Sequence, residues 1–174
     1  MNIAAQAPVQ ADQTIYLKDY QKPAFLVESI HLDIQVYDDH TIVDSTLVMK
    51  RQAAGELVLL GRDLELQSIQ MNGQLLNADQ YQLDSEQLVI TDAPDQVILK
   101  IQVVIHPESN TQLEGLYKAG DLFVTQNEPE GFRKITFYPD RPDVLAEFTT
   151  RVEADKKYPV LLANGNRSEE HTSE

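Results

Sequence analysis

The sequence predicts an all-β fold, and specifically a β-sandwich, from two observations. Apolar and polar residues alternate along much of the chain, and turn-forming residues separate the short apolar runs. Alternation with a period of two indicates strands with one buried face, because successive side chains point to opposite faces of a sheet. Convincing helical periodicity is missing. Many short strands with frequent turns are typical of two sheets packed face to face.

The clearest strand runs from Ile30 to Val36, where every second residue is apolar and those between are polar. Asp38-Asp39-His40 then predicts a turn, because Asp is a common turn residue. Thr41 to Met49 predicts the returning strand. Val97 to Ile105 repeats the alternation and ends at His106-Pro107. These three segments form the framework of the predicted sandwich.

Shorter apolar runs predict further strands at Leu57–Leu60, Leu64–Met71, Leu88–Thr91 and Leu122–Val124. Asn72-Gly73 follows the second of them and is a strong signal for a two-residue hairpin.

One short helix is predicted near the end of the chain. It would begin at Pro142, with Asp140 as its cap, and run through Val144 to Ala146. Phe148 to Val152 then return to alternation, which predicts a late strand.

Composition limits the classes of function. The 42% hydrophobic content is enough for one domain with a sizeable core. Acidic residues outnumber basic ones, 28 to 14, which disfavours nucleic-acid binding. The absence of cysteine excludes disulfides and thiolate metal sites. No run approaches the roughly 18 apolar residues that a membrane-spanning helix needs, so no membrane partner is expected.

The two ends of the chain differ from the rest. Residues 1–13 are rich in Ala and Gln and lack the basic and apolar regions of a signal peptide, which predicts a disordered tail and a cytoplasmic protein. Residues 14–166 would form the β-sandwich. Residues 167–174 contain no apolar residue and, read back into codons, match a common sequencing adapter. We expect this adapter-derived tail to be non-native; the alternative is a natural acidic tail.

Common catalytic signatures are absent from the sequence, including Gly-x-Ser-x-Gly, a phosphate-binding glycine-rich loop and His-Glu-x-x-His. The four histidines have no metal-ligand spacing and are interpreted as solvated surface residues: His31, His40, His106 and His171. We therefore predict no catalytic residue and no metal ligand in this chain.

The most informative stretch is Thr125 to Asp143. If the extended backbone persists past Val124, Gln126 and Glu128 project from the same face. A carboxylate beside an amide could hold an ammonium group by charge-assisted hydrogen bonds. The alternative is a pair of exposed polar residues at a strand end. The end of this stretch is Asp140-Arg141-Pro142-Asp143. For its three charged residues we favour a structural salt-bridge cluster that fixes the loop.

From about Tyr16 to Asn166 the chain resembles the N-terminal domain of bacterial aminopeptidase N, in the gluzincin class of zinc metallopeptidases. The residues that carry this resemblance occur in order along the second half of the sequence. They are Leu113-Glu114-Gly115-Leu116-Tyr117, Thr125-Gln126, Glu128, Glu130-Gly131-Phe132-Arg133, Ile135-Thr136, Asp140-Arg141-Pro142-Asp143-Val144-Leu145-Ala146, Phe148-Thr149-Thr150, Tyr158-Pro159 and Asn164-Gly165-Asn166.

The resemblance implies a saddle-like β-sandwich that packs on a catalytic domain and sends one loop into its active site. It implies that Glu128 binds the free α-ammonium group of a peptide substrate and that Gln126 lines the pocket for the first side chain. The zinc cofactor would be bound by the missing catalytic domain and not by this chain. The chain as given is therefore expected to be an inactive fragment that stops before the last strands of its own domain.

Two alternatives remain open at this point. A stand-alone β-sandwich that serves as a binding or scaffold module fits the composition and the strand pattern equally well. A relative that keeps this domain but has lost peptidase chemistry would carry the same residues.

Overall fold

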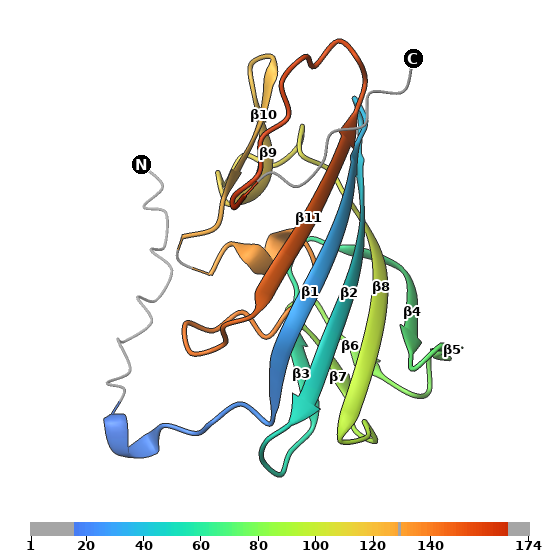
Figure 1. Ribbon diagram of the computed structural model, residues 1–174, viewed down its shortest axis with the longest axis vertical. Helices are drawn as coiled ribbons and strands as arrows, with labels where there is room; N and C mark the ends of the chain where they lie inside the picture. Colours follow the sequence, from blue (N-terminus) through green and yellow to red (C-terminus); the bar gives the residue numbers. More distant parts are fainter. Residues whose placement is uncertain (1–15, 129, 167–174) are drawn as a thin grey trace, which may run out of the picture.

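The computed structural model describes residues 16–128 and 130–166, and it confirms the all-β prediction (Figure 1). The expected tails at 1–13 and 167–174 lie outside the described residues. The elements are, in chain order, η1 (Leu17–Asp19), β1 (Phe25–Val36), β2 (Thr41–Arg51), β3 (Leu57–Leu60), β4 (Glu65–Met71), β5 (Gln74–Leu75), β6 (Gln82–Leu83), β7 (Gln87–Ile90), β8 (Gln96–Ile105), β9 (Gly115–Ala119), β10 (Leu122–Gln126), η2 (Phe132–Lys134) and β11 (Glu147–Ala154).

The strands form a large sheet and two smaller ones. The large sheet has the order β11-β1-β2-β8-β4-β5, and a second sheet has the order β3-β7-β6. Strands β9 and β10 form a separate hairpin, which stands at one end of the molecule in Figure 1. All neighbours pair antiparallel except β1 and β11, which are parallel.

The core lies between the large sheet and the β3-β7-β6 sheet. Leu47 and Leu99 of the large sheet and Leu59 and Leu88 of the smaller one are completely buried in one contiguous cluster. Burying each such side chain contributes about 1.5–3 kcal/mol, which is why the two inner faces pack together. The packing of two sheets through these residues is the predicted sandwich.

The main strand predictions are confirmed. Ile30–Val36 lies within β1, Thr41–Met49 within β2 and Val97–Ile105 within β8. The Asp38–His40 turn closes with a 3.0 Å hydrogen bond from the Tyr37 amide to the His40 carbonyl oxygen.

The predicted hairpin at Asn72-Gly73 is also confirmed. Met71 pairs with Gln74, and the two residues between them have φ values of 51° and 83°. Positive φ at both central positions is the requirement of a tight hairpin turn, and Asn-Gly satisfies it best.

The predicted helix at Pro142–Ala146 is wrong. Only one turn forms, in which the Val144 amide donates to the Arg141 carbonyl oxygen at 3.1 Å. Asp140 pairs with Arg133 instead of capping a helix, and Val144 is buried in the core. A segment this short cannot nucleate a helix by itself, so the tertiary contacts decide its conformation.

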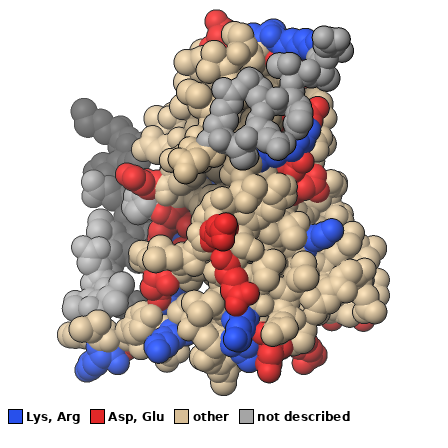
Figure 2. Space-filling view, in the orientation of Figure 1, with Lys and Arg blue, Asp and Glu red and all other residues tan. Residues whose placement is uncertain are grey.

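The described surface is mixed in charge. Figure 2 shows acidic and basic side chains next to each other along the lower part of one face. None of the helices in the described part of the chain is long and apolar enough to cross a membrane.

Candidate functional site

The structure places Gln126 and Glu128, here called the candidate pair, at the end of the β9–β10 hairpin. Gln126 is the last residue of β10 and pairs with Gly115 of β9, and Glu128 lies in the turn that follows. Both residues are exposed. The extended backbone stops at Gln126, so strand alternation does not reach Glu128. The turn, rather than the pleat of a strand, determines how Glu128 is presented.

A close backbone approach holds this turn. The Gly131 amide donates to the Asn127 carbonyl oxygen at 3.2 Å. A Cβ atom added at Gly131 would lie 2.7 Å from the Gln126 carbonyl oxygen and 2.8 Å from the Asn127 Cα atom. Only glycine lets the chain return this closely over the candidate pair.

A second glycine, Gly115, begins β9, the strand that pairs with β10. Gly115, the cross-strand partner of Gln126, has a φ of 71°. A Cβ atom at Gly115 would lie 2.6 Å from the Cβ atom of Lys134 in η2. The start of β9 therefore packs directly on η2. Because β10 pairs with β9, this contact also fixes the position of β10 relative to η2.

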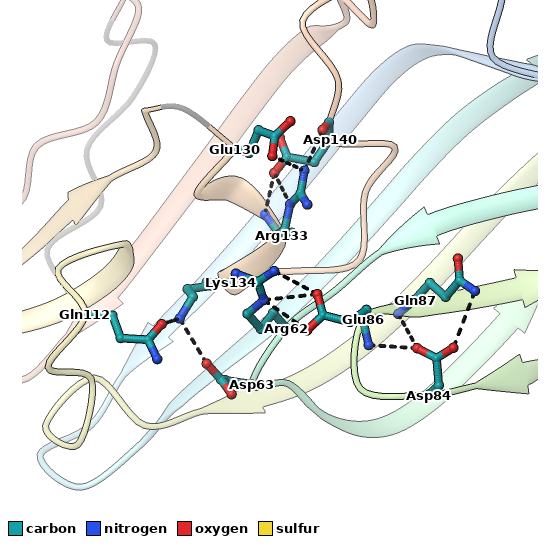
Figure 3. Close-up of polar contacts among 10 residues, drawn as sticks. All are labelled: Arg62, Asp63, Asp84, Glu86, Gln87, Gln112, Glu130, Arg133, Lys134 and Asp140. Atoms are coloured by element: carbon teal, nitrogen blue, oxygen red, sulfur yellow. Dashed lines mark hydrogen bonds and ion pairs between the residues drawn. The ribbon is translucent and has the colours of Figure 1, made fainter. Parts of the chain in front are cut away.

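Lys134 itself is a buried cation, only 5% exposed. Its Nζ atom donates to Asp63 Oδ2 at 2.9 Å and also to the side-chain oxygen of Gln112 (Figure 3). Asp63 lies between β3 and β4, and Gln112 lies between β8 and β9. The ammonium group thus connects η2 to two separate loops. Sequence reasoning missed this residue, although a lysine directly before Ile135-Thr136-Phe137 was a sign of a buried charge.

A second, part-buried ion pair fixes the loop after η2. Arg133 Nε donates to Asp140 Oδ2 at 3.0 Å, and the Arg133 guanidinium also donates to the Asp140 carbonyl oxygen at 3.0 Å. These two side chains are 12% and 14% exposed. Glu130 adds a longer contact of 3.3 Å to Arg133.

The predicted structural cluster of Asp140, Arg141 and Asp143 is therefore present as two separate ion pairs. Arg141 pairs with Asp143 at 2.8 Å, whereas Asp140 pairs with Arg133. The hydrogen bonds from Arg141 lower the pKa of Asp143, and Tyr20 adds a further one at 2.8 Å. Both pairs stabilise the loop.

The middle of the stretch belongs to the core. Phe137 and Tyr138 are buried, and Tyr138 forms a backbone bridge with Leu60 of β3. Thr136 shares a buried 2.8 Å hydrogen bond with Ser45 of β2. Burial raises the pKa of Tyr138 to about 12. The candidate pair thus lies at the exposed end of a segment whose middle is buried.

Two of the three described histidines contact other residues, and the third is exposed. His106 contacts the Asp39 carbonyl oxygen at 3.2 Å and Glu65 at 3.0 Å, His40 stacks on Tyr37, and His31 is exposed on β1. His171 lies outside the described residues. Within residues 16–128 and 130–166, no group of His, Cys, Asp and Glu side chains is arranged to hold a metal ion.

Chemically, the candidate pair offers a carboxylate and an amide, both of which can accept hydrogen bonds. The Glu128 carboxylate makes no ion pair with any other described residue. An exposed carboxylate and amide suit the binding of a cation. A separate groove of about 600 Å³ lies on the other side of Lys134 and is lined by Asp63, His106 and Gln112, but not by the candidate pair.

Comparison with known proteins gives a consistent result. Residues 18–174 match the peptidase M1 N-terminal domain. The chain is 44% identical over 156 residues to aminopeptidase N of Caulobacter vibrioides, and 44% identical over 161 residues to aminopeptidase N of Escherichia coli. These alignments cover 88% and 91% of this chain, and the chain spans 18% of the length of each relative.

Solved structures agree in fold. Legionella pneumophila aminopeptidase A, in complex with aspartic acid, superposes with a TM-score of 0.80 at 31% identity, covering 86% of this chain and 18% of that one. An M1 zinc metallopeptidase from Deinococcus radiodurans superposes with a TM-score of 0.64 over 76% of this chain and 33% of that one. Its 21% identity supports the shared fold alone.

Proposed function

The chain belongs to the peptidase M1 family, whose N-terminal domain it forms, and from that premise we propose that the full-length protein is a zinc-dependent aminopeptidase. It removes N-terminal amino acids from peptides, and this domain contributes the anchor for the substrate's α-ammonium group. The observation that carries the proposal is that Glu128, two residues after Gln126 at the end of β10, is exposed on a turn that Gly131 closes.

The proposed anchor explains how an exopeptidase selects a chain end. Only the amino terminus of a peptide carries a charged amine, whereas the nitrogen atoms of its interior are neutral amides. Glu128 accepts charge-assisted hydrogen bonds from the ammonium group, and Gln126 lines the pocket for the first side chain. A peptide interior in the same place would leave the carboxylate unpaired, which is costly once water is excluded.

In this proposal, substrate anchoring and zinc-dependent hydrolysis belong to different domains of the protein. The described part of this chain does not provide a zinc site. We assign zinc binding and hydrolysis to a catalytic domain elsewhere in the full-length protein, on which this domain packs. The chain by itself is expected to be inactive, and its contribution is to bind and orient the amino terminus.

Replacing Glu128 in the full-length protein tests the anchor. Truncating one partner of a desolvated charge pair costs roughly 3–5 kcal/mol. We therefore expect Glu128→Ala to lower kcat/KM for an aminoacyl p-nitroanilide by about 100-fold or more. Glu128→Gln keeps one hydrogen-bond acceptor and is expected to lose less.

The matched control is Glu56→Ala, since Glu56 is another exposed glutamate and lies in the loop between β2 and β3. This variant is expected to keep wild-type kinetics. A loss below about threefold for Glu128→Ala would rule out the anchoring role.

A further inference from the structure

We propose that Lys134 is a positioning residue for the candidate pair: its buried ammonium group fixes η2 against two loops and thereby sets where Gln126 and Glu128 stand. This inference rests on the proposed role of Glu128 and extends it to a residue that need not touch the substrate.

The first step of the argument is the unusual burial of a charge. The Lys134 side chain is only 4% exposed, although lysine is seldom fully buried unless it is paired. Its ion-pair partner Asp63 remains 69% exposed. The Lys134 ammonium group therefore meets the Asp63 carboxylate at the lining of the 600 Å³ groove. A methionine could fill the same volume without any charge, and buried ion pairs are weak evidence for stability. The ammonium group therefore calls for a role beyond packing.

The second step is the number of segments that the ammonium group joins. It contacts Asp63 before β4 and Gln112 before β9, and the two loops are not neighbours in sequence. Asp63 has a φ of 57°, and Leu113, next to Gln112, has a φ of 59°. Left-handed backbone at a leucine is uncommon and is retained only where surrounding contacts impose it. The loop at Gln112 thus adopts an unfavourable backbone conformation beside a residue that binds Lys134, whereas aspartate tolerates the left-handed conformation at Asp63.

The third step connects Lys134 to the candidate pair through two glycines, Gly115 and Gly131. Its Cβ atom lies under Gly115, the cross-strand partner of Gln126, at a distance that excludes any side chain there. Its amide donates to the Gly131 carbonyl oxygen at 3.1 Å, and Gly131 packs on the backbone of Gln126. Lys134 therefore contacts two residues that pack against the end of β10: Gly115 on the paired strand and Gly131 in the following turn. If its ammonium group is removed, the loops at Asp63 and Gln112 lose their common partner, and the support under β9 relaxes.

The test is a double-mutant cycle in the full-length protein, with kcat/KM for an aminoacyl p-nitroanilide as the readout. We expect Lys134→Met to lower kcat/KM about tenfold in the wild-type background and less than twofold in the Glu128→Ala background, because the residue acts through the anchor. Lys134→Arg keeps the charge and is expected to restore most of the activity. Arg62→Met removes a neighbouring but more exposed ion pair with Glu86, and this control is expected to change kcat/KM less than twofold.

Asp63→Asn is the second variant, for use if Lys134→Met does not fold. Asn suits the left-handed backbone at this position but removes the ion pair. A threefold loss that disappears in the Glu128→Ala background is the expected result for it.

Equal losses in both backgrounds, or a lower melting temperature with unchanged kcat/KM, would show that Lys134 is merely structural and would overturn the proposal. If Glu128→Ala itself has no effect, the proposed function fails instead, so the two failures are distinguishable.

Discussion

At the scale of single residues, burial separates the ionisable groups into two kinds. Lys134 is buried, Arg133 and Asp140 are largely shielded from solvent, and all three connect segments around the candidate pair. The pairs beside β11, such as Arg151 with Asp33, lie at the surface. Exposed pairs contribute little because water and salt screen them, whereas removing one partner of a buried pair leaves an uncompensated charge. The charges that position the candidate pair are therefore of the first kind.

His106 gives this domain a predictable dependence on pH. The hydrogen bond to the Asp39 carbonyl oxygen, followed by that to Glu65, raises the pKa of His106 above its usual value. A raised folded-state pKa means that this stabilisation is complete below the unfolded value of about 6.5 and is lost as pH rises through the folded value. We expect the free energy of unfolding to fall over this window, by less than about 1 kcal/mol because the side chain is 44% exposed.

Thermal unfolding between pH 5.5 and pH 8 would measure this effect, a window chosen around the ~6.5 reference pKa of histidine. His106→Gln, which cannot titrate, should flatten the dependence, and Glu65→Gln should weaken it by removing one acceptor. The same pH dependence in His106→Gln and wild type would contradict the assignment.

At the scale of elements, local signals succeed where a turn is specified by its own residues. Asn72-Gly73 forms its hairpin because both residues accept positive φ. The segment from Pro142 to Ala146 also has local helix signals, but Tyr20 donates a hydrogen bond to Asp143 and Val144 enters the core. Contacts with distant residues outweigh a weak helical preference there. The β9–β10 hairpin lies between these cases. A glycine is required at its start, Gly115, because Lys134 packs against that position, and not because of its neighbours in sequence.

The two left-handed glycines of this hairpin allow a matched comparison. Gly120 has a φ of 62° with nothing near an added Cβ atom, whereas Gly115 has a φ of 71° and meets Lys134. Gly120→Ala is expected to cost about 1 kcal/mol from backbone strain alone. Gly115→Ala adds an overlap that forces η2 or β9 to move, and should cost roughly 1–3 kcal/mol more. Urea unfolding midpoints at equal slope would measure the difference; equal costs would show that η2 yields freely.

At the scale of the whole molecule, the large sheet reaches its edge at β11. Among the described residues, no strand pairs with the side of β11 that faces away from β1. Phe148 on β11 is half exposed, and Val160, Leu161 and Leu162 follow as a run of exposed apolar residues. An open strand edge and exposed apolar side chains each favour association with another chain or domain.

We therefore expect the 174-residue chain, produced alone, to self-associate. Sedimentation velocity should show a sedimentation coefficient that rises with protein concentration. Replacing Val160 and Leu162 together by lysine should reduce this rise, because charge opposes association of the exposed run. Leu75→Lys, at the opposite edge of the large sheet and similarly exposed, is the control and should leave it unchanged. A monomer at all concentrations would contradict this expectation.

Much of the fold was predictable because it depends on local pattern. The alternation in β1, β2 and β8 places the core residues on one face, and that pattern is written in consecutive residues. The parallel pairing of β11 with β1 was not predictable, because Phe148 meets Ile30 across more than a hundred residues. Strand β9 was missed for a similar reason, since it owes its place to η2 and β10.

For the candidate site, the sequence by itself determined which residue types were available. The family resemblance singled out Gln126 and Glu128, whose spacing alone left a pair of exposed polar residues open, and the sequence favoured a structural role for Asp140, Arg141 and Asp143. Only the tertiary structure decided how they are held: Gly131 and Gly115 allow the close approaches, and Lys134 joins two distant loops beneath them. The physical reason is that a strand pattern depends on neighbours along the chain, whereas a buried charge and a close glycine contact depend on partners that folding brings together.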